Sequence, residues 1–297
     1  MTRRAPWRTG LLALAGIVLA LVIILPFAFA LSASLQTESQ LIKRPPPLVA
    51  IPPTIDNYRY VFTGEVPQAY AQRALLRGSV TQDARVLPKG LRNSTIVALG
   101  TVLLNLILGT FAAYTFARVR FRGRQVAFTF ILASRLLPTM AVAIPVYEIL
   151  RRLNLLDSKL GLIAIYSAFT LPFTIWVLTM YFRSLPPEME EAARVDGCTR
   201  FGALRHVALP LAAPGLAAVA AFSFLFSYSE FPFALFTTST TNAKTIPVMV
   251  SSISVNPDAS YTLVAVGIVL SIFAPILFAL VFRRYITKGL VASLTRS

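Results

Sequence analysis

The chain has 297 residues, of which 56% are hydrophobic and only 13% are charged, and its mean hydropathy is +0.69. This composition excludes most soluble globular proteins and is typical of a polytopic membrane protein. The formal net charge of +16 would also suit a nucleic-acid-binding protein. The basic residues cluster beside apolar runs, however, so retention at a membrane surface explains them better. We therefore expect a lipid bilayer, and no nucleic acid, as a partner.

Several kinds of chemistry are also excluded by residue counts. Cys198 is the only cysteine and His206 the only histidine. One cysteine cannot form an intrachain disulfide, and nothing in the sequence suggests a metal site. There is no GxxxxGK[ST] phosphate-binding motif, so the chain should not hydrolyse ATP itself. We expect no catalytic residue, no metal and no cofactor in this chain.

The N-terminal segment carries Arg3, Arg4 and Arg8, and an apolar run follows over about 10–31. The run is too long for a signal peptide and lacks a clear small-residue cleavage site, so we interpret it as a first membrane span. A polar, proline-rich segment with eight Lys/Arg covers residues 32–92. Long loops cross a membrane largely regardless of their charge, so we expect this segment to be an extracytoplasmic loop.

Five further apolar runs predict five more spans. Each exceeds the roughly 20 residues that are needed to cross about 30 Å of hydrocarbon. Lipid offers no hydrogen-bonding partner to the backbone, so each run should be helical. Prolines inside the runs, such as Pro138 and Pro145, should kink them. The predicted fold is all-α, with one transmembrane domain over residues 1–297 and six transmembrane helices. The five runs are at about 95–117, 126–150, 160–182, 211–236 and 261–282.

The short connection over 118–124 gives the strongest orientation signal, because it contains four arginines and no acid. The C-terminal tail adds Arg283, Arg284, Lys288 and Arg296. By the positive-inside rule, both termini and the loop over 183–210 should face the cytoplasm. The connections over 151–159 and 237–260 should then face outward.

A polar, charged stretch over 185–214 interrupts the apolar pattern. Prolines and acidic residues at its start are typical of a helix N-terminus. Met189, Ala192 and Ala193 have helical spacing and share one mostly small face, which another surface can approach closely. Asp196-Gly197 should stop this helix, with the glycine in a left-handed conformation.

A second short helix should follow this stop. Thr199 can cap its N-terminus, and we expect it to run to about Ala208, where Leu209-Pro210 would end it. The stretch is therefore predicted to be a helical hairpin between two spans. From these physical features alone, the hairpin can be either a solvated connection or a docking element.

The same stretch resembles the EAA motif of bacterial ABC importer permeases. Glu191-Ala192-Ala193 is followed after three residues by Gly197, and nine residues later by Val207-Ala208-Leu209-Pro210. The family usually has Ile where this chain has Val207. In that family the loop is a coupling helix that docks into a groove of a separate ATPase subunit. The resemblance implies that Glu191, Ala192, Ala193, Asp196, Gly197, Leu209 and Pro210 contact the ATPase.

Other segments resemble the carbohydrate-uptake branch of these permeases. They include the NYxxxF pattern within 54–62, the Asn93-Ser94 pair, the IPVY sequence at 144–147 followed by LNLLD at 153–157, and the tail at 283–290. The chain is similar to the smaller permease subunit of maltose/trehalose-type transporters, which have the type I importer fold. The resemblance implies a second permease subunit, two ATPase subunits that hold ATP and magnesium, and an extracytoplasmic sugar-binding protein that contacts 237–260.

Five residues are candidates for the substrate path: Asn105, Arg135, Tyr147, Tyr228 and Glu230. A charge as deep in a span as Arg135 should face the bundle interior, a partner or water. Amide and aromatic side chains are the groups with which proteins hold sugars. The alternatives are structural, because Arg135 can snorkel or pair with a neighbouring subunit, polar side chains also join helices, and aromatic residues also form interfacial belts.

These observations predict the permease subunit of an ATP-driven, binding-protein-dependent importer of a disaccharide or oligosaccharide in the bacterial cytoplasmic membrane. A permease for a non-sugar solute shares the coupling loop and is the first alternative. A secondary transporter is the second, although the two halves of the chain show no inverted repeat and no pair of acids lies mid-span.

Overall fold

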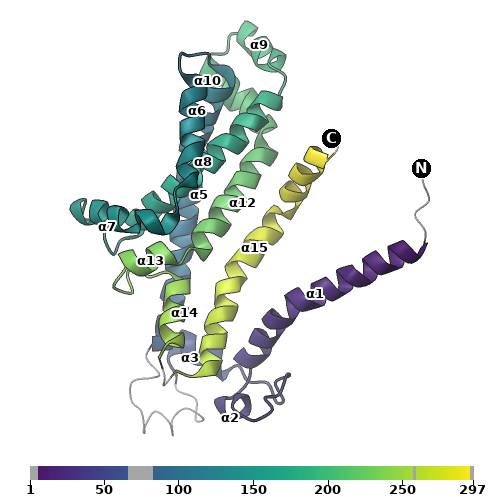
Figure 1. The fold of residues 1–297 in the computed structure, drawn as a ribbon, viewed down its shortest axis with the longest axis vertical. Helices are drawn as coiled ribbons and strands as arrows, with labels where there is room; N and C mark the ends of the chain where they lie inside the picture. Colours follow the sequence, from purple (N-terminus) through teal and green to yellow (C-terminus); the bar gives the residue numbers. More distant parts are fainter. Residues whose placement is uncertain (1–5, 66–82, 257–258, 295–297) are drawn as a thin grey trace. The chain divides into compact units, whose positions relative to one another are not determined.

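The computed structural model describes residues 6–65, 83–256 and 259–294, and all regular structure in these ranges is helical (Figure 1). The all-α prediction is therefore confirmed for the described residues. Within the described ranges, four helices are long and apolar enough to span a membrane: 10–34, 84–118, 159–184 and 261–283. Two sharply bent helix pairs raise this number to six if each pair counts as one span. The chain divides into two units, residues 1–88 with 249–272 and residues 89–248 with 273–297, which we describe separately.

In the first unit, α1 (Pro6–Ser34) is an apolar helix whose side chains are exposed from residue 10 to residue 29. The segment after it, for which the sequence predicted an extracytoplasmic loop but no secondary structure, contains two short helices, α2 (Glu38–Leu41) and α3 (Asp56–Thr63). The Glu38 carboxylate accepts hydrogen bonds from the Ser260 hydroxyl (2.5 Å) and from the backbone N–H of Tyr261 (3.3 Å) at the start of α15 (Tyr261–Leu294). Polar contacts therefore fold this loop onto the beginning of α15.

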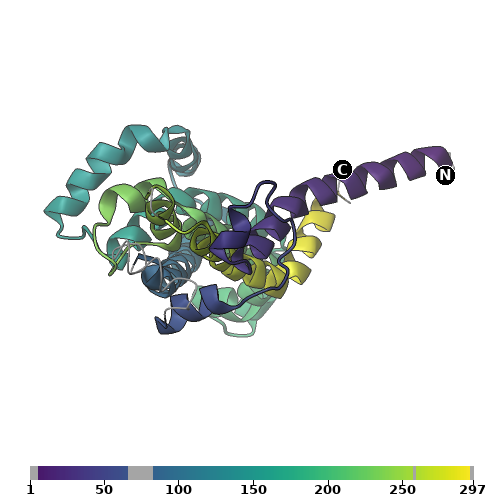
Figure 2. The same ribbon diagram turned by 90° about the horizontal axis from the view of Figure 1, so that it is seen from below.

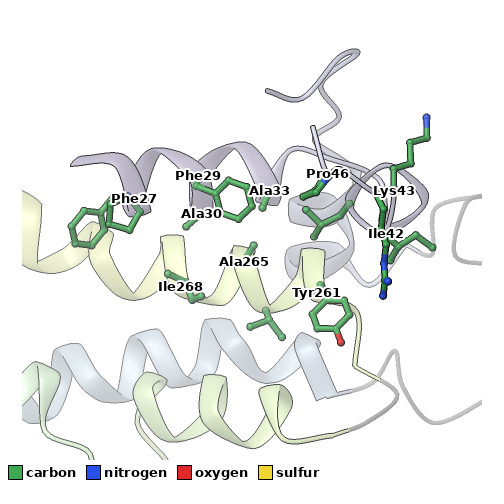
Figure 3. A pocket seen from close by; sticks show the side chains of 14 residues that line it. Phe27, Phe29, Ala30, Ala33, Ile42, Lys43, Pro46, Tyr261, Ala265 and Ile268 are labelled. Atoms are coloured by element: carbon green, nitrogen blue, oxygen red, sulfur yellow. The ribbon is translucent and has the colours of Figure 1, made fainter. Parts of the chain in front are cut away.

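An open cavity of about 760 Å³ lies between α1 and α15 within the first unit (Figure 3). Phe27, Phe29, Ala265 and other apolar side chains make up most of its lining, and its charged lining residues are Lys43 and Arg44. A sugar site needs several converging polar groups. We therefore do not assign substrate binding to this cavity.

The second unit is built around three helices: α5 (Leu87–Arg118), α8 (Lys159–Ser184) and α12 (Ala213–Ser229). Leu178, Phe182 and Val219 belong to one of its buried clusters. α5 and α8 approach closely at Gly109, where an added Cβ would lie 2.5 Å from Cγ2 of Thr174. Small residues permit such close contact between apolar helices.

The third apolar run, predicted as one span over 126–150, is broken. α6 (Arg124–Ala133) is followed by two 3₁₀ turns, η2 (Ser134–Leu136) and η3 (Thr139–Val142), and then by α7 (Ala143–Arg152). The two halves meet at 96°, and both views show α7 turned away from α6 (Figures 1 and 2). Pro138 explains the break, because it lacks an N–H and pushes Leu137 into an extended conformation (ψ 124°).

The other predicted boundaries also differ from the observed helices. The fifth run, predicted over 211–236, contains the 17-residue α12 and the separate short helix α13 (Pro232–Thr237). Glu230 has extended backbone angles and ends α12 just before Pro232. α5 and α15 are longer than the predicted spans over 95–117 and 261–282. α14 (Ile246–Ser254) lies in the connection predicted over 237–260.

Candidate functional site

The hairpin (residues 185–211) connects α8 to α12 and lies at one end of the second unit (Figure 1). Its first helix, α9 (Glu188–Val195), ends where predicted, and Gly197 has a φ of +93°. Most side chains are strained in this left-handed region, whereas glycine is not. The second helix starts at α10 (Arg200–Ala203), where the Thr199 hydroxyl accepts a hydrogen bond from the N–H of Gly202 (3.1 Å). Both local predictions, the glycine stop and the threonine cap, are confirmed.

The predicted end of the second helix at Leu209-Pro210 is wrong. A π-helical turn, η4 (Leu204–Ala208), leads directly into α11 (Leu209–Leu211), and the N–H of Leu209 bonds to the carbonyl of Leu204. A proline removes one helical N–H, and its ring collides with the carbonyl four residues earlier. The wider π turn relieves this collision, so the helix passes through Pro210. The chain bends by 76° only after Leu211.

The EAA residues lie mainly on the open surface of the hairpin. Glu191, Ala192, Asp196, Gly197 and Pro210 are exposed, whereas Ala193 and Leu209 are half-buried. Val195, at the end of α9, has 88% of its surface exposed, and Met189 has 46%. Apolar side chains exposed beside small and acidic residues are typical of a surface that another protein covers. The sequence pattern did not single out Val195, whose exposure only the observed orientation of α9 reveals.

Glu190 is the one residue of α9 that is buried. Its Oε1 accepts a hydrogen bond from Nε of Arg118 (2.8 Å), and its Oε2 accepts one from the Tyr114 hydroxyl (2.6 Å). Arg118 also donates from Nη2 to the carbonyl of Leu185 (3.0 Å). These contacts join the hairpin to the last turns of α5. In the sequence, Glu190 was one of several acids at a helix N-terminus, and nothing distinguished it from its neighbours.

A second candidate site is the α13–α14 loop, residues 238–245. The Asp157 carboxylate accepts hydrogen bonds from the backbone N–H groups of Ser239 and Thr240 (3.0 Å each) and from the Thr240 hydroxyl (2.5 Å). The N–H of Asp157 donates to the carbonyl of Thr237 (2.8 Å). Partial burial raises the pKa of Asp157, but the hydrogen bonds from Thr240 and Ser239, with the nearby Lys244 charge, outweigh it and hold that pKa below its usual value.

The same loop is also held from α5. The Asn93 side-chain amide donates to the carbonyls of Thr241 (3.0 Å) and Lys244 (2.9 Å), and the Ser94 hydroxyl accepts from the N–H of Ile246 (2.9 Å). Asn93 and Ser94 are buried. In the sequence this pair was part of a family resemblance only, and its hydrogen bonds now give it a physical role as the anchor of the loop.

Three of the five substrate-path candidates lie in the interior of the second unit. Asn105 is 1% exposed, and its amide nitrogen donates to the hydroxyls of Thr170 (2.6 Å) and Ser223 (2.9 Å), which joins α5, α8 and α12. Tyr228 is 2% exposed. The Glu230 carboxylate accepts hydrogen bonds from the N–H groups of Phe233 (2.9 Å) and Ala234 (3.3 Å) and so caps α13. These hydrogen bonds favour the structural alternative for Asn105 and Glu230, whereas the buried Tyr228 hydroxyl has no hydrogen-bond partner among the described residues.

The other two candidates, Arg135 and Tyr147, are exposed. Arg135 lies at the break in the third run, and its guanidinium carbon is 5.2 Å from the centre of the Phe173 ring and 5.8 Å from that of Phe222. Such cation–π contacts stabilise a charge without neutralising it. Of the five candidates, these two are exposed and the other three are buried.

Comparisons with known proteins identify the family. The profile of "Binding-protein-dependent transport system inner membrane component" matches residues 105–290, which is well over half of the chain. The chain belongs to this family. Its members are membrane components of transporters and not enzymes themselves. The family prediction from the EAA motif is confirmed.

Curated relatives match nearly the whole chain. The trehalose/maltose transport system permease protein MalG of Thermococcus litoralis is 29% identical over 283 residues, which cover 95% of each chain. The trehalose transport system permease protein SugB of Mycobacterium tuberculosis is 31% identical and covers 91% of each chain. The sulfoquinovosyl glycerol transport system permease protein SmoH of Agrobacterium fabrum is 30% identical and covers 90% of this chain and 87% of its own.

A solved structure supports the fold. A chain of a bacterial ABC transporter that imports the acidic polysaccharide alginate superposes with a TM-score of 0.76 and 22% identity, over 96% of this chain and 99% of that chain. At this identity the likeness establishes the fold alone. The chain therefore has the fold of an ABC importer permease, as predicted.

Proposed function

We propose that this chain is the permease subunit of an ATP-driven, binding-protein-dependent importer of a disaccharide or oligosaccharide. Family membership supports the transport role. The sugar class is supported by relatives named for trehalose, maltose and sulfoquinovosyl glycerol transport. The match to this chain includes at least 87% of the length of each of these relatives. The proposed location is the bacterial cytoplasmic membrane, with both termini and the hairpin on the cytoplasmic side.

One observation carries the proposed mechanism, namely the exposed face of α9. Glu191, Ala192 and Val195 project from a short helix with fixed ends. Small side chains permit close backbone approach, while Val195 adds apolar area to be buried. We assign this face to the groove of an ATPase subunit. ATP and magnesium are held by the two ATPase subunits, and this chain contributes no cofactor.

The transport cycle follows from this docking. ATP closes the ATPase pair, the docked hairpin moves with it, and the spans change between inward-facing and outward-facing arrangements. A binding protein delivers sugar to the outward-facing state, and we assign this contact to the α13–α14 loop and its surroundings within 237–260. Each ligand must bind the two states with different affinity, because otherwise it shifts no equilibrium.

A second permease subunit completes the proposed complex. The apolar surface of α1 supports this assignment, because residues 10 to 29 of this helix are all exposed within the first unit. Small-residue and apolar surfaces are the means by which membrane helices associate.

Site-specific cross-linking in the assembled complex tests the docking. Cys198 is replaced by serine, and a cysteine is introduced either at Ala193 in the hairpin or at Ser239 in the α13–α14 loop. We expect the Ala193→Cys variant to cross-link to the P-loop ATPase and the Ser239→Cys variant to cross-link to the binding protein. The reverse pattern would refute the assignment of both sites.

A substrate panel tests the sugar assignment. The purified complex with its binding protein should show ATP hydrolysis that is stimulated by a disaccharide or short oligosaccharide. Stimulation by an amino acid, a polyamine or phosphate, with none by any sugar in the panel, would instead indicate a permease for a non-sugar solute.

A further inference from the structure

The attachment of α9 to the rest of the second unit is unusual. Helices next to a hydrophobic core normally bury an apolar stripe. In α9 the buried residue is the acid Glu190, and the apolar residues Met189 and Val195 are exposed. The Glu190 carboxylate therefore supplies the attachment of α9 to α5, and the exposed apolar side chains of Met189 and Val195 take no part in it.

The contact formed by Glu190, Arg118 and Tyr114 is directional. The side chains of Arg118 and Glu190 are 17% and 10% exposed, and both carboxylate oxygens are occupied, one by each partner. Removing two charges from water consumes much of the energy of their attraction, so such a pair adds little to stability. Its hydrogen bonds, however, hold the two groups at fixed distances and angles. The contact is thus better suited to positioning α9 than to stabilising it.

The partners of Glu190 in this contact belong to α5, one of the long helices of the second unit. Tyr114 and Arg118 are four positions apart in sequence, so they are neighbours on one face of α5. The same helix continues without a break to Asn105, about 20 Å away at 1.5 Å per residue. Asn105 joins α5 to α8 and α12 through Thr170 and Ser223. One rigid element therefore connects the hairpin with the buried junction of three helices.

We propose that Glu190 is the positioning residue through which movement of the hairpin reaches α5. This inference depends on the proposed function, because it takes the hairpin to be the element that the ATPase moves. Arg118 and Tyr114 hold the Glu190 carboxylate, so a displacement of α9 shifts the end of α5 with it. Without this contact α9 still docks, but its movement is no longer passed to the spans.

The test separates docking from transmission. It uses the assembled complex in lipid vesicles and measures sugar uptake, ATP hydrolysis and the Ala193→Cys cross-link to the ATPase. Glu190→Gln keeps the shape of the side chain but removes its charge and leaves Arg118 without its ion-pair partner. We expect an intact cross-link, continued ATP hydrolysis and a loss of about tenfold or more in sugar transported per ATP, consistent with losing a hydrogen bond to a charged group.

Further variants make the result specific. Tyr114→Phe removes one hydrogen bond but keeps the ion pair, so its loss of coupling should be smaller, about two- to fivefold. The exchange Glu190→Arg with Arg118→Glu restores a pair of opposite charges and should recover part of the coupling lost in either single exchange. Glu148→Gln is the matched control, because the Glu148 carboxylate also pairs with arginines, but these are Arg151 and Arg152 of its own helix α7, and the change should leave all three measurements unaltered.

Each other outcome contradicts the inference in a distinguishable way. If Glu190→Gln abolishes the cross-link and ATP hydrolysis together with uptake, Glu190 only maintains the docking surface, and transmission through it is refuted while the proposed function stands. Unchanged uptake per ATP also refutes it. If the unmodified complex neither cross-links at residue 193 nor hydrolyses ATP in response to sugar, the proposed function itself fails and this inference fails with it.

Discussion

The hairpin and the α13–α14 loop are both polar connections in the second unit, but they are held in opposite ways. The loop is fixed by the Asp157 side chain at one end and by Asn93 and Ser94 at the other. In the hairpin, Glu190 is the buried residue of α9, and its carboxylate binds Arg118 and Tyr114 of α5. A loop fixed along its length can bind a partner with little loss of conformational entropy. A helix fixed at one directional contact can instead move and pull on its attachment.

The largest effect is expected where the hairpin depends on backbone conformation. Gly197→Val places a β-branched residue at a φ of +93°, which costs about 1–3 kcal/mol or displaces the turn. An added Cβ at Gly197 would meet no atom within 4 Å, so the strain comes from the backbone and not from a collision. We expect sugar uptake to be lost and copurification of the ATPase to fall sharply.

The control for this prediction uses the same position. Asn tolerates the left-handed region better than other non-glycine residues, so Gly197→Asn should retain most of the uptake. Equal loss in the Asn and Val variants would mean that bulk at the docking surface matters, and not the turn conformation.

A smaller effect is expected in the α13–α14 loop. Asp157→Ala removes the acceptor of three hydrogen bonds, and the freed loop must then be ordered when the binding protein docks. The concentration of binding protein that half-maximally stimulates ATP hydrolysis should rise about three- to tenfold. Asp157→Asn keeps one acceptor oxygen and should lie between the Ala variant and the wild type. If the half-maximal concentration of binding protein were unchanged in the Ala variant, the hydrogen bonds to Asp157 would not be needed for the binding protein to dock.

The same carboxylate predicts a pH dependence of the α13–α14 loop. The pKa of Asp157 is below its usual value in the folded chain, so the unfolded loop binds the proton more readily. Its stabilisation is therefore complete above the usual pKa of about 4 and is lost as the pH falls through the lowered value. Amide exchange of residues 239 and 240 should accelerate below about pH 4 relative to Asp157→Asn at the same pH. Equal exchange rates in the two proteins across this range would contradict the prediction.

The difference between the two connections also explains what sequence could predict. The Gly197 stop and the Thr199 cap depend on residues within a few positions of each other, so local rules were sufficient. The acceptors of the Asn93 amide, at Thr241 and Lys244, are about 150 residues away in sequence, and Arg118 is 72 residues from Glu190. No periodicity reports such distant pairs. Pro138 and Pro145 predicted kinks in the third span, but a bend of 96° depends on packing that a single sequence does not contain.

The smallest effect is expected at a second buried acid of the same unit, Glu230, which sharpens the contrast with Glu190. Glu190 binds charged and hydroxyl side chains of another helix, whereas Glu230 binds two backbone N–H groups of α13, three and four residues further along the chain. Glu230→Gln keeps one acceptor oxygen and so loses only part of the cap, and it should change neither uptake nor the KM for sugar. Glu230→Ala removes the cap, costs about 1 kcal/mol and should lower the thermal stability of the complex with little change in KM. A clear rise in KM for Glu230→Gln at unchanged stability would instead place Glu230 in contact with the sugar and restore it to the substrate path.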